Sequence, residues 1–328
     1  MPVPNGDDLQ QRLLRPLLWS MLVAVVIYGG SVIASDFNAV SASIARLGMT
    51  GWAVVLGLSL ANYALRFLRW EIYLSRLNSR ISALQSLAYY IGGFAFTTTP
   101  GKAGEAVRSL YLKRHGVPYV HSLAAFFTER LVDLVAMVLL SMVAALAFPA
   151  YRWPVLIVTM LILMLLPLVH ANSFHAFLEL QLSRLSSERL RSIGSRLMDV
   201  VRSASSLLRS APLYAGLVLA LIAWGAEGVA FYVILEALEV HISLELAVGI
   251  YSVSVLVGAL SFIPGGLGTT EAVMVLLLKL VGADTPTAVA ATLICRLATL
   301  WFAVIIGAIV LTVLEINGKA GRQQAPNV

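Results

Sequence analysis

Apolar residues occur along the chain in runs that are long enough to cross a bilayer, a distance that takes about 20 residues of helix. Two other segments, 86–115 and 247–281, are also apolar, but Pro-Gly pairs interrupt them. The pattern predicts an all-α, polytopic helix bundle with two broken segments that each enter and leave the membrane on one side. The six uninterrupted runs lie near 16–35, 51–68, 124–148, 154–171, 212–235 and 287–314.

Positive charge between the runs predicts their orientation. Four arginines from Arg66 to Arg80 follow the second run, and six more lie between Arg184 and Arg209, whereas the alternate loops contain few. Because cytoplasmic loops of membrane proteins carry an excess of Lys and Arg, both termini are expected in the cytoplasm. If the broken segments cross fully, the number of crossings becomes eight, and the orientation of the termini is kept only if both segments cross as complete hairpins. A secretory signal is the alternative for the first run, but the membrane segments that follow favour a span.

The stretch 173–211 is the one sizeable polar segment. Its apolar residues recur at helical spacing between arginines, which predicts one or two amphipathic helices on the anionic cytoplasmic leaflet. A plain connector packed on neighbouring loops is the alternative. In either case the whole chain, 1–328, is expected to form a single membrane domain.

The composition excludes a soluble globule. Hydrophobic residues make up 59% of the 328 residues and charged residues 12%, against roughly 45–50% and about 25% in soluble domains. The single cysteine, Cys295, excludes a disulfide scaffold. The net charge of +6 is spread between the apolar runs rather than gathered on a soluble face, so we expect no nucleic-acid partner.

An internal repeat appears when residues 105–134 are aligned with residues 271–300. Twelve of these 30 positions are identical, and the matches include a Glu, a Lys, a Gly and an Arg in register. Three crossings separate the matched elements, so the pattern predicts two inverted repeats, one at about 51–148 and one at about 212–315. Inverted repeats are typical of secondary transporters, and a duplication kept only for packing is the alternative.

The first break, at Pro100-Gly101, predicts a re-entrant helical hairpin whose second half begins near Gly104. The free N–H groups of a helix start attract anions, and Lys102 and Arg108 lie beside this one. The sequence therefore predicts a site for a phosphate or carboxylate head group. The alternative is that both side chains extend to the cytoplasmic interface and bind nothing specific.

The second break, at Pro264-Gly265, predicts a similar hairpin, with Thr269 or Thr270 as the helix cap. Gly266 stands in place of Lys102, so the two hairpins differ chemically. We expect the second to act as a gate or a passage lined by backbone.

Each repeat carries one acid at the start of a half-helix and one base 25 residues later, Glu105 with Arg130 and Glu271 with Arg296. A lone charge near the bilayer centre costs about 2.5–3.5 kcal/mol or more, so these groups are predicted to pair inside the membrane. The pairs either fix the fold or take part in transport.

Three other carboxylates lie within apolar runs. Glu227 is the clearest membrane-embedded acid, while Glu129 and Asp133 flank Arg130 on one helix. Such groups mark ion or proton pathways by default, although a neutral, hydrogen-bonded packing role is also feasible. We interpret all three as candidates for ion or proton coupling.

Motifs for catalysis and for cofactor binding are absent. The chain contains no HExxH, GxSxG, P-loop or CxxC sequence and no cluster of metal-ligand spacing, so no catalytic residue, metal or cofactor is expected.

The motifs resemble those of the membrane region of lysylphosphatidylglycerol synthases and of the stand-alone flippase-like proteins that share it, including hopanoid-associated membrane proteins. The resemblance rests on Arg69-Trp70, TTTPGKAGEAVRSLYLKRHG, ERLVD, FIPGGLGTTEA and CRLATL. It implies a protein of the bacterial cytoplasmic (inner) membrane that translocates or presents an anionic or aminoacylated lipid. The bifunctional synthases carry a C-terminal aminoacyl transferase domain, whereas this chain stops shortly after its last run, so lipid synthesis is not expected of it. The resemblance places Pro100, Gly101, Gly104, Glu105, Arg108, Glu129, Arg130 and Asp133 in the family's first motif and Pro264, Gly265, Gly266, Gly268 and Glu271 in its second.

Three functions are therefore compared, and a lipid transporter is the leading one. The first alternative is an intramembrane enzyme that acts on a lipid-linked sugar or phosphate with Glu105, Glu129 and Asp133 as acid and base. The second is an accessory subunit that recruits a lipid-modifying enzyme through 173–211. The candidate head-group residues are Pro100, Gly101, Lys102, Gly104, Glu105, Arg108, Arg130, Pro264, Gly265, Gly266, Gly268, Glu271 and Arg296.

Overall fold

The computed structural model describes residues 37–147 and 188–323, together with isolated positions between 153 and 180. These residues form helices and turns, with no strand among them, so the all-helical prediction is confirmed for this part of the chain. The predicted run near 16–35 and most of the run near 154–171 lie outside the described residues.

Within the described residues, three helical stretches are long and apolar enough to cross a membrane. They are α3 (Gly48–Arg76), α10 (Ser210–Ala237) and a stretch formed by α13 (Thr285–Arg296), the π-helical turn η5 (Leu297–Trp301) and α14 (Phe302–Gln323). The 29 residues of α3 extend about 43 Å, which exceeds the bilayer's hydrocarbon thickness of about 30 Å. These stretches correspond to the predicted runs at 51–68, 212–235 and 287–314.

The helix α6 (Tyr119–Ala147) also has 29 residues, but it carries Glu129, Arg130 and Asp133 near its middle. Such charges inside a long apolar helix require partners, and α3, α10 and α11 pack around it. The charged turn of α6 is therefore buried inside the bundle.

Each interrupted segment folds as two helices joined by a short irregular connection. The first consists of α4 (Ala83–Gly93), the 3-10 turns η1 (Phe94–Phe96) and η2 (Pro100–Val107), and α5 (Arg108–Lys113). The second consists of α11 (Leu244–Leu260), η4 (Pro264–Gly266) and α12 (Thr269–Leu280).

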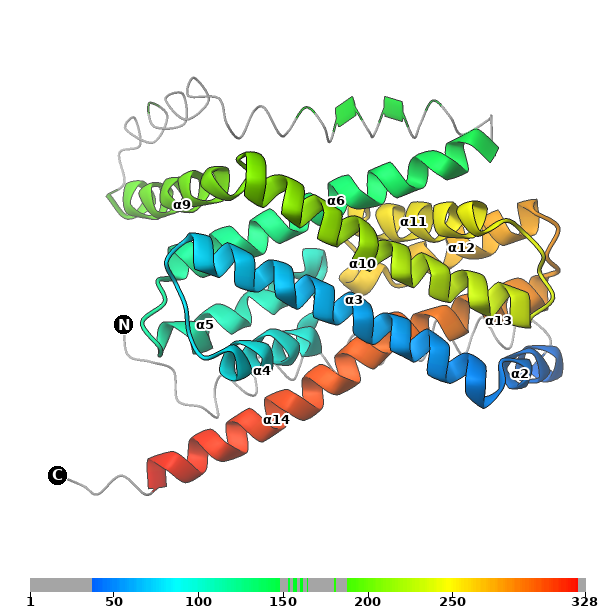
Figure 1. Ribbon diagram of the computed structural model, residues 1–328, viewed down its shortest axis with the longest axis horizontal. Coiled ribbons are helices and arrows are strands. Elements are labelled where there is room, and N and C mark those ends of the chain that lie inside the picture. The colour runs from blue at the N-terminus through cyan, green and yellow to red at the C-terminus, as the bar shows by residue number, and fades with distance from the viewer. Residues whose placement is uncertain are drawn as a thin grey trace.

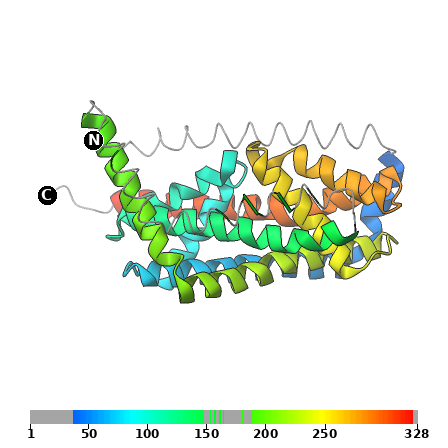
Figure 2. The same cartoon turned by 90° about the horizontal axis from the view of Figure 1, so that it is seen from above.

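The two interrupted segments approach each other from opposite ends of the bundle. In Figure 1, α4 and α5 lie toward the left end and α11 and α12 toward the right end, and Figure 2 keeps the cyan and yellow segments on these sides. Their breaks meet near the middle, where η2 contacts η4. The contact is close, because a Cβ built on Gly265 would lie 3.4 Å from the Cα of Thr98.

The amphipathic stretch 173–211 is described mainly through α9 (Glu188–Leu207). Val200 and Ala204 are buried against Ala124 of α6, while Leu197 is exposed. One apolar stripe of α9 therefore packs on protein, and its contact with a lipid leaflet stays a prediction.

Candidate functional site

A cavity of about 260 Å³ lies where the two breaks meet. Its wall comes from α3, α6, α10, α11, both breaks and the π-helical turn η5. The wall is mostly apolar, as in typical ligand sites, with a few convergent polar groups. The charged side chains that line it are Arg66, Lys102, Arg130, Asp133, Glu227 and Arg296.

Arg66 of α3 is the basic group of this wall that the sequence analysis did not select. Its side chain is 5% exposed, and its guanidinium carbon lies 5.3 Å from the ring centre of Phe94 and 5.5 Å from that of Trp224. Its Nε and Nη2 atoms lack a hydrogen-bond partner, and no carboxylate of the described residues lies within 4 Å of it. Arg66 is therefore a buried cation held by aromatic rings, with no acid paired to it.

Lys102 reaches the same wall from the first break. Its Nζ lies 5.4 Å from the ring centre of Trp224, and its backbone adopts a positive φ of 56°, which is uncommon for a residue with a side chain. Arg66 and Lys102 thus approach the indole of Trp224 from two different elements.

Arg108, the other predicted partner of an anion, does not line the cavity. It is buried, stacks on the ring of Trp70 at 3.8 Å and donates a short hydrogen bond to Glu129. The predicted helix start near Gly104 is also displaced, because a 3-10 turn covers Pro100–Val107 and the α-helix begins at Arg108. The N–H of Gly104 is bound by the Thr99 hydroxyl at 2.7 Å and is therefore occupied within the chain.

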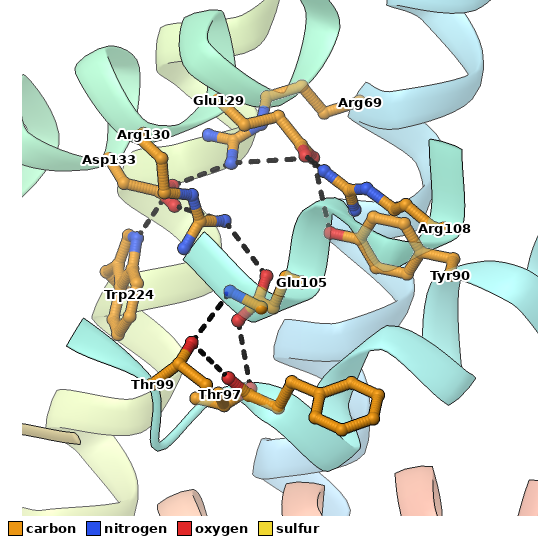
Figure 3. Close-up of polar contacts among 12 residues, drawn as sticks. Arg69, Tyr90, Thr97, Thr99, Glu105, Arg108, Glu129, Arg130, Asp133 and Trp224 are labelled. Carbon is orange, nitrogen blue, oxygen red and sulfur yellow. Dashed lines mark hydrogen bonds and ion pairs between the residues drawn. The ribbon is translucent and has the colours of Figure 1, made fainter. Parts of the chain in front are cut away.

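One turn of α6 organises the charges on this side of the cavity (Figure 3). Glu129 also accepts a hydrogen bond from Tyr90 at 3.2 Å, and Arg69 lies 4.0 Å from it. Asp133 accepts hydrogen bonds from Arg69 at 2.6 Å and from the indole of Trp224 at 3.0 Å. Both acids are thus held by arginines and by neutral donors.

The first predicted ion pair is present. Arg130 lies 3.7 Å from Glu105 and 3.2 Å from Asp133, so it bridges the break to α6. Glu105 also accepts a hydrogen bond from Thr97 at 2.9 Å. The pairing predicted from the repeat is confirmed, and it fixes the connection between η1 and η2 in place.

The second predicted pair is present as well, and it holds the second break. Arg296 donates to Glu271 at 2.7 Å and to the carbonyl of Gly265 at 2.6 Å. Glu271 in turn accepts the N–H of Gly268 at 2.6 Å. Both repeats therefore use the same acid–base pair to anchor their breaks.

The predicted cap of this half-helix by Thr269 or Thr270 is wrong. The N-cap residue is Gly268, with a φ of +85°, and its own N–H is satisfied by the Glu271 carboxylate three residues later. The Thr269 hydroxyl instead donates to the carbonyl of Gly266 at 3.0 Å. The left-handed backbone at Gly268 turns the chain so that the acid of the first helical turn reaches back, a geometry that a propensity rule does not reveal.

Replacing Gly268 with Ala should lower the free energy of unfolding by about 1–2 kcal/mol, because a side chain disfavours a left-handed backbone by this amount. The matched control is Gly57→Ala, since nothing lies within 4 Å of a Cβ at this helical position. The control should leave stability unchanged or raise it by up to about 1 kcal/mol. Unfolding in detergent by added denaturant measures both, and equal effects would contradict the geometry at Gly268.

Glu227 lines the cavity from α10. It is buried and accepts a short hydrogen bond from the Tyr251 hydroxyl of α11. No Lys or Arg of the described residues lies within 4 Å of its carboxylate. Glu227 therefore has a neutral donor and, among the described residues, no arginine as its partner, whereas arginines also hold Glu129 and Asp133.

The comparisons with known proteins cover the helices that form this cavity. The family described as the lysylphosphatidylglycerol synthase TM region matches residues 18–307. A UPF0104 membrane protein of Methanothermobacter thermautotrophicus is 27% identical over 327 residues, which cover 92% of this chain and 93% of the relative. A UPF0104 membrane protein of Methanocaldococcus jannaschii is 28% identical over 68% of this chain and 95% of its own length. A third, from Pyrococcus horikoshii, is 26% identical over 74% of this chain and 80% of its own length. The chain therefore belongs to the lysylphosphatidylglycerol synthase TM region family.

Proposed function

We propose that the protein is a lipid transporter of the flippase-like type, which moves the head group of an anionic or aminoacylated lipid between leaflets through the cavity at the two breaks. The observation that carries this proposal is Arg66, a buried cation that lines a cavity among membrane-spanning helices and has no acidic partner among the residues that the structure describes. Ionisable groups placed in this way inside a membrane protein mark a substrate or ion path.

In this proposal the two interrupted segments are re-entrant hairpins of two inverted repeats. Their approach from opposite ends of the bundle supports this arrangement (Figure 1), and so does the matched anchoring of the breaks by Glu105 with Arg130 and Glu271 with Arg296. Transporters built from inverted repeats bind their substrates where such discontinuous helices meet near the bilayer midplane.

The orientation follows from the charge at the two ends of the bundle. The end where α3 and α5 finish and α10 begins is rich in basic residues, whereas the opposite end carries more acidic than basic residues. In this proposal the basic end and both termini face the cytoplasm, because basic loops stay there, and the protein lies in the inner membrane. The basic end carries Arg76, Arg80, Lys113, Arg114 and Arg209, and the opposite end carries Glu236, Glu239, Glu245 and Asp284 against Arg46 and Lys279.

Glu227 is the group that we propose for proton coupling. Arginines already hold Glu129 and Asp133, whereas Glu227 lines the cavity and, within the described part of the chain, has the Tyr251 hydroxyl as its hydrogen-bond partner and no basic side chain within 4 Å. A carboxyl group in this position gains or loses its proton without breaking an ion pair. The same observation weighs against an intramembrane enzyme, because the proposed acid and base residues Glu105, Glu129 and Asp133 are all engaged by arginines.

Reconstitution into liposomes tests the proposal. Fluorescent anionic lipid in the inner leaflet should become accessible to an external reductant faster with the protein than in empty vesicles. Ala259→Trp should slow this exchange by about tenfold or more, which corresponds to about 1.4 kcal/mol of barrier. Ala259 is exposed and lines the cavity, so a larger side chain there fills the entrance without disturbing the core.

The matched control is Ala215→Trp, which adds the same side chain at an exposed position of α10 away from the cavity. Its exchange rate should equal that of the unaltered protein. Equal slowing by both substitutions would contradict passage through the cavity. Chemical conversion of the lipid without exchange would favour the enzyme, and a lipid-modifying enzyme that co-purifies with an inactive protein would favour the accessory subunit.

A further inference from the structure

The basic side chains around the cavity outnumber the acidic ones. Four of the six basic side chains lie within 4 Å of an acid, and the exceptions in the described part of the chain are Arg66 and Lys102. These two also line the cavity, and each lies within 6 Å of the ring centre of Trp224. The basic side chains are Arg66, Arg69, Lys102, Arg108, Arg130 and Arg296, and the acidic ones are Glu105, Glu129, Asp133, Glu227 and Glu271.

Six basic and five acidic side chains leave one positive charge over when all of them are charged, which favours the binding of an anion. A buried guanidinium without a counter-ion is strongly disfavoured, and aromatic rings compensate for only part of the lost hydration. A phosphate group suits both partners, because the fork of an arginine binds two of its oxygens and a lysine supplies a point charge. The Nε and Nη2 donors of Arg66, which have no hydrogen-bond acceptor among the described residues, provide such a fork.

The size of the cavity restricts what it encloses. Its volume of about 260 Å³ lies below the roughly 300–1,000 Å³ of pockets that enclose a whole drug-sized ligand. A phosphate-containing head group is small enough for this space, whereas a head group together with two acyl chains is too large. The chains of a bound lipid would therefore have to lie outside.

One edge of the cavity provides an apolar exit. Leu260, Phe262 and Ile263 belong to its wall and are nevertheless 43%, 71% and 40% exposed. They lie at the end of α11 and in the second break that follows it, which contacts the first break near the middle of the bundle (Figure 1). Phe262 has a positive φ of 54°, a strained conformation that is typical of functional positions.

We propose that the cavity binds the phosphate of a phospholipid between Arg66 and Lys102 while its acyl chains pass over Leu260, Phe262 and Ile263 into the surrounding bilayer. This inference rests on the proposed transport function and names its substrate class and its entrance. The three residues, called the lateral portal below, connect the surplus charge to the hydrocarbon. A free phosphate ion that enters from water carries no acyl chains, so an apolar edge would not contribute to its binding.

Fluorescence quenching by brominated lipid tests the proposal. Phe262→Cys places the label at the lateral portal, and the native Cys295 is buried and does not compete for it. Maltoside micelles contain no phosphate, so phosphatidylglycerol with brominated acyl chains is added as the sole phospholipid. Brominated diacylglycerol, which lacks the phosphate, is the lipid control. A label at Ile309→Cys, which is exposed on α14 outside the cavity, is the position control.

The expected result is saturable quenching at position 262 by phosphatidylglycerol, with no saturable component from diacylglycerol or at position 309. Arg66→Gln should raise the half-saturating concentration by about tenfold or more, as expected for loss of a charged hydrogen bond. Lys102→Gln should act in the same direction, and because Lys102 is only half-buried, this variant tests the site even if Arg66→Gln does not fold. Arg209→Gln removes an exposed charge and should change nothing.

Equal quenching by the two lipids, or quenching unaffected by both Arg66→Gln and Lys102→Gln, would overturn the proposal. Displacement of the lipid by an equal concentration of glycerol phosphate would also overturn it, because the site would then take its phosphate from water. Retained leaflet exchange without saturable quenching would reject this site and leave the transporter standing. Saturable quenching in a protein that exchanges no lipid would support this site and contradict the transport function.

Discussion

Glu129→Gln should lower the free energy of unfolding by about 3–5 kcal/mol, the cost of removing one partner from a buried ion pair. The carboxylate of Glu129 is fully buried, pairs with Arg108 and lies 4.0 Å from Arg69. The amide of Gln keeps the shape but not the charge, so Arg108 loses its counter-ion inside the bundle. Equilibrium unfolding in detergent measures the change.

The control for this prediction is Glu239→Gln. Glu239 pairs with Arg46 at 3.4 Å, but both side chains are more than half exposed. Water and salt screen such a pair, so its loss should cost less than about 1 kcal/mol. Similar values for the buried and the exposed pair would show that Glu129 lies near solvent, against the packing around α6.

The second large effect is expected at the pair that anchors the second break. Glu271→Gln and Arg296→Met should each cost about 3–5 kcal/mol, since each leaves a charge in the interior without its partner. Glu271 also accepts the N–H of Gly268, and Arg296 also holds the carbonyl of Gly265, so both losses should loosen the break. Unfolding and leaflet exchange are measured on the same samples.

A double-mutant cycle separates the pair from its surroundings. The variant that carries both substitutions should be more stable than the sum of the single effects predicts, by about 1–3 kcal/mol of coupling. Lipid exchange between the leaflets should be slow in the double variant, as in Arg296→Met alone, because both variants lack the hydrogen bond from Arg296 to the Gly265 carbonyl. Strict additivity would contradict the pairing, and full exchange in the double variant would remove the anchoring role of Arg296.

The internal repeat explains why the sequence could predict the ion pairs. Glu105 and Arg130 recur as Glu271 and Arg296 with identical spacing, so one inference applied to both halves, and both pairs form. The breaks were equally visible, because Pro-Gly pairs within apolar runs leave few other arrangements. Periodicity and composition thus predicted the helices and the positions of their interruptions.

Arg66 could not be selected in the same way. It stands four positions from Trp70 in a run that also contains Arg69, and the sequence does not determine which side of α3 meets the break. That relation depends on Phe94 and Trp224, which are distant in sequence and surround the guanidinium only after packing. A hint was available in the aromatic neighbours Tyr63 and Trp70, which share its face of the helix.

Arg108, in contrast, was selected from the sequence but does not line the cavity. Its place one turn into the half-helix predicted contact with a ligand, yet the fold brings Glu129 and Trp70 to it. An arginine near a helix start binds whichever anion the tertiary structure supplies, and here that anion is a carboxylate of α6. Local spacing identified a cation that needs a partner but not the partner itself.

Spin labels measure whether the two breaks are neighbours inside the bilayer. Labels at Lys102→Cys and Ile263→Cys lie on one cavity wall, whereas Leu87→Cys on α4 replaces the first label in the control pair. In reconstituted membranes we expect strong dipolar broadening for the first pair and none for the control, with the label at position 263 more accessible to oxygen than to a water-soluble nickel complex. No broadening, or greater exposure of position 263 to the nickel complex, would place the breaks apart or in water and contradict passage of lipid head groups between them.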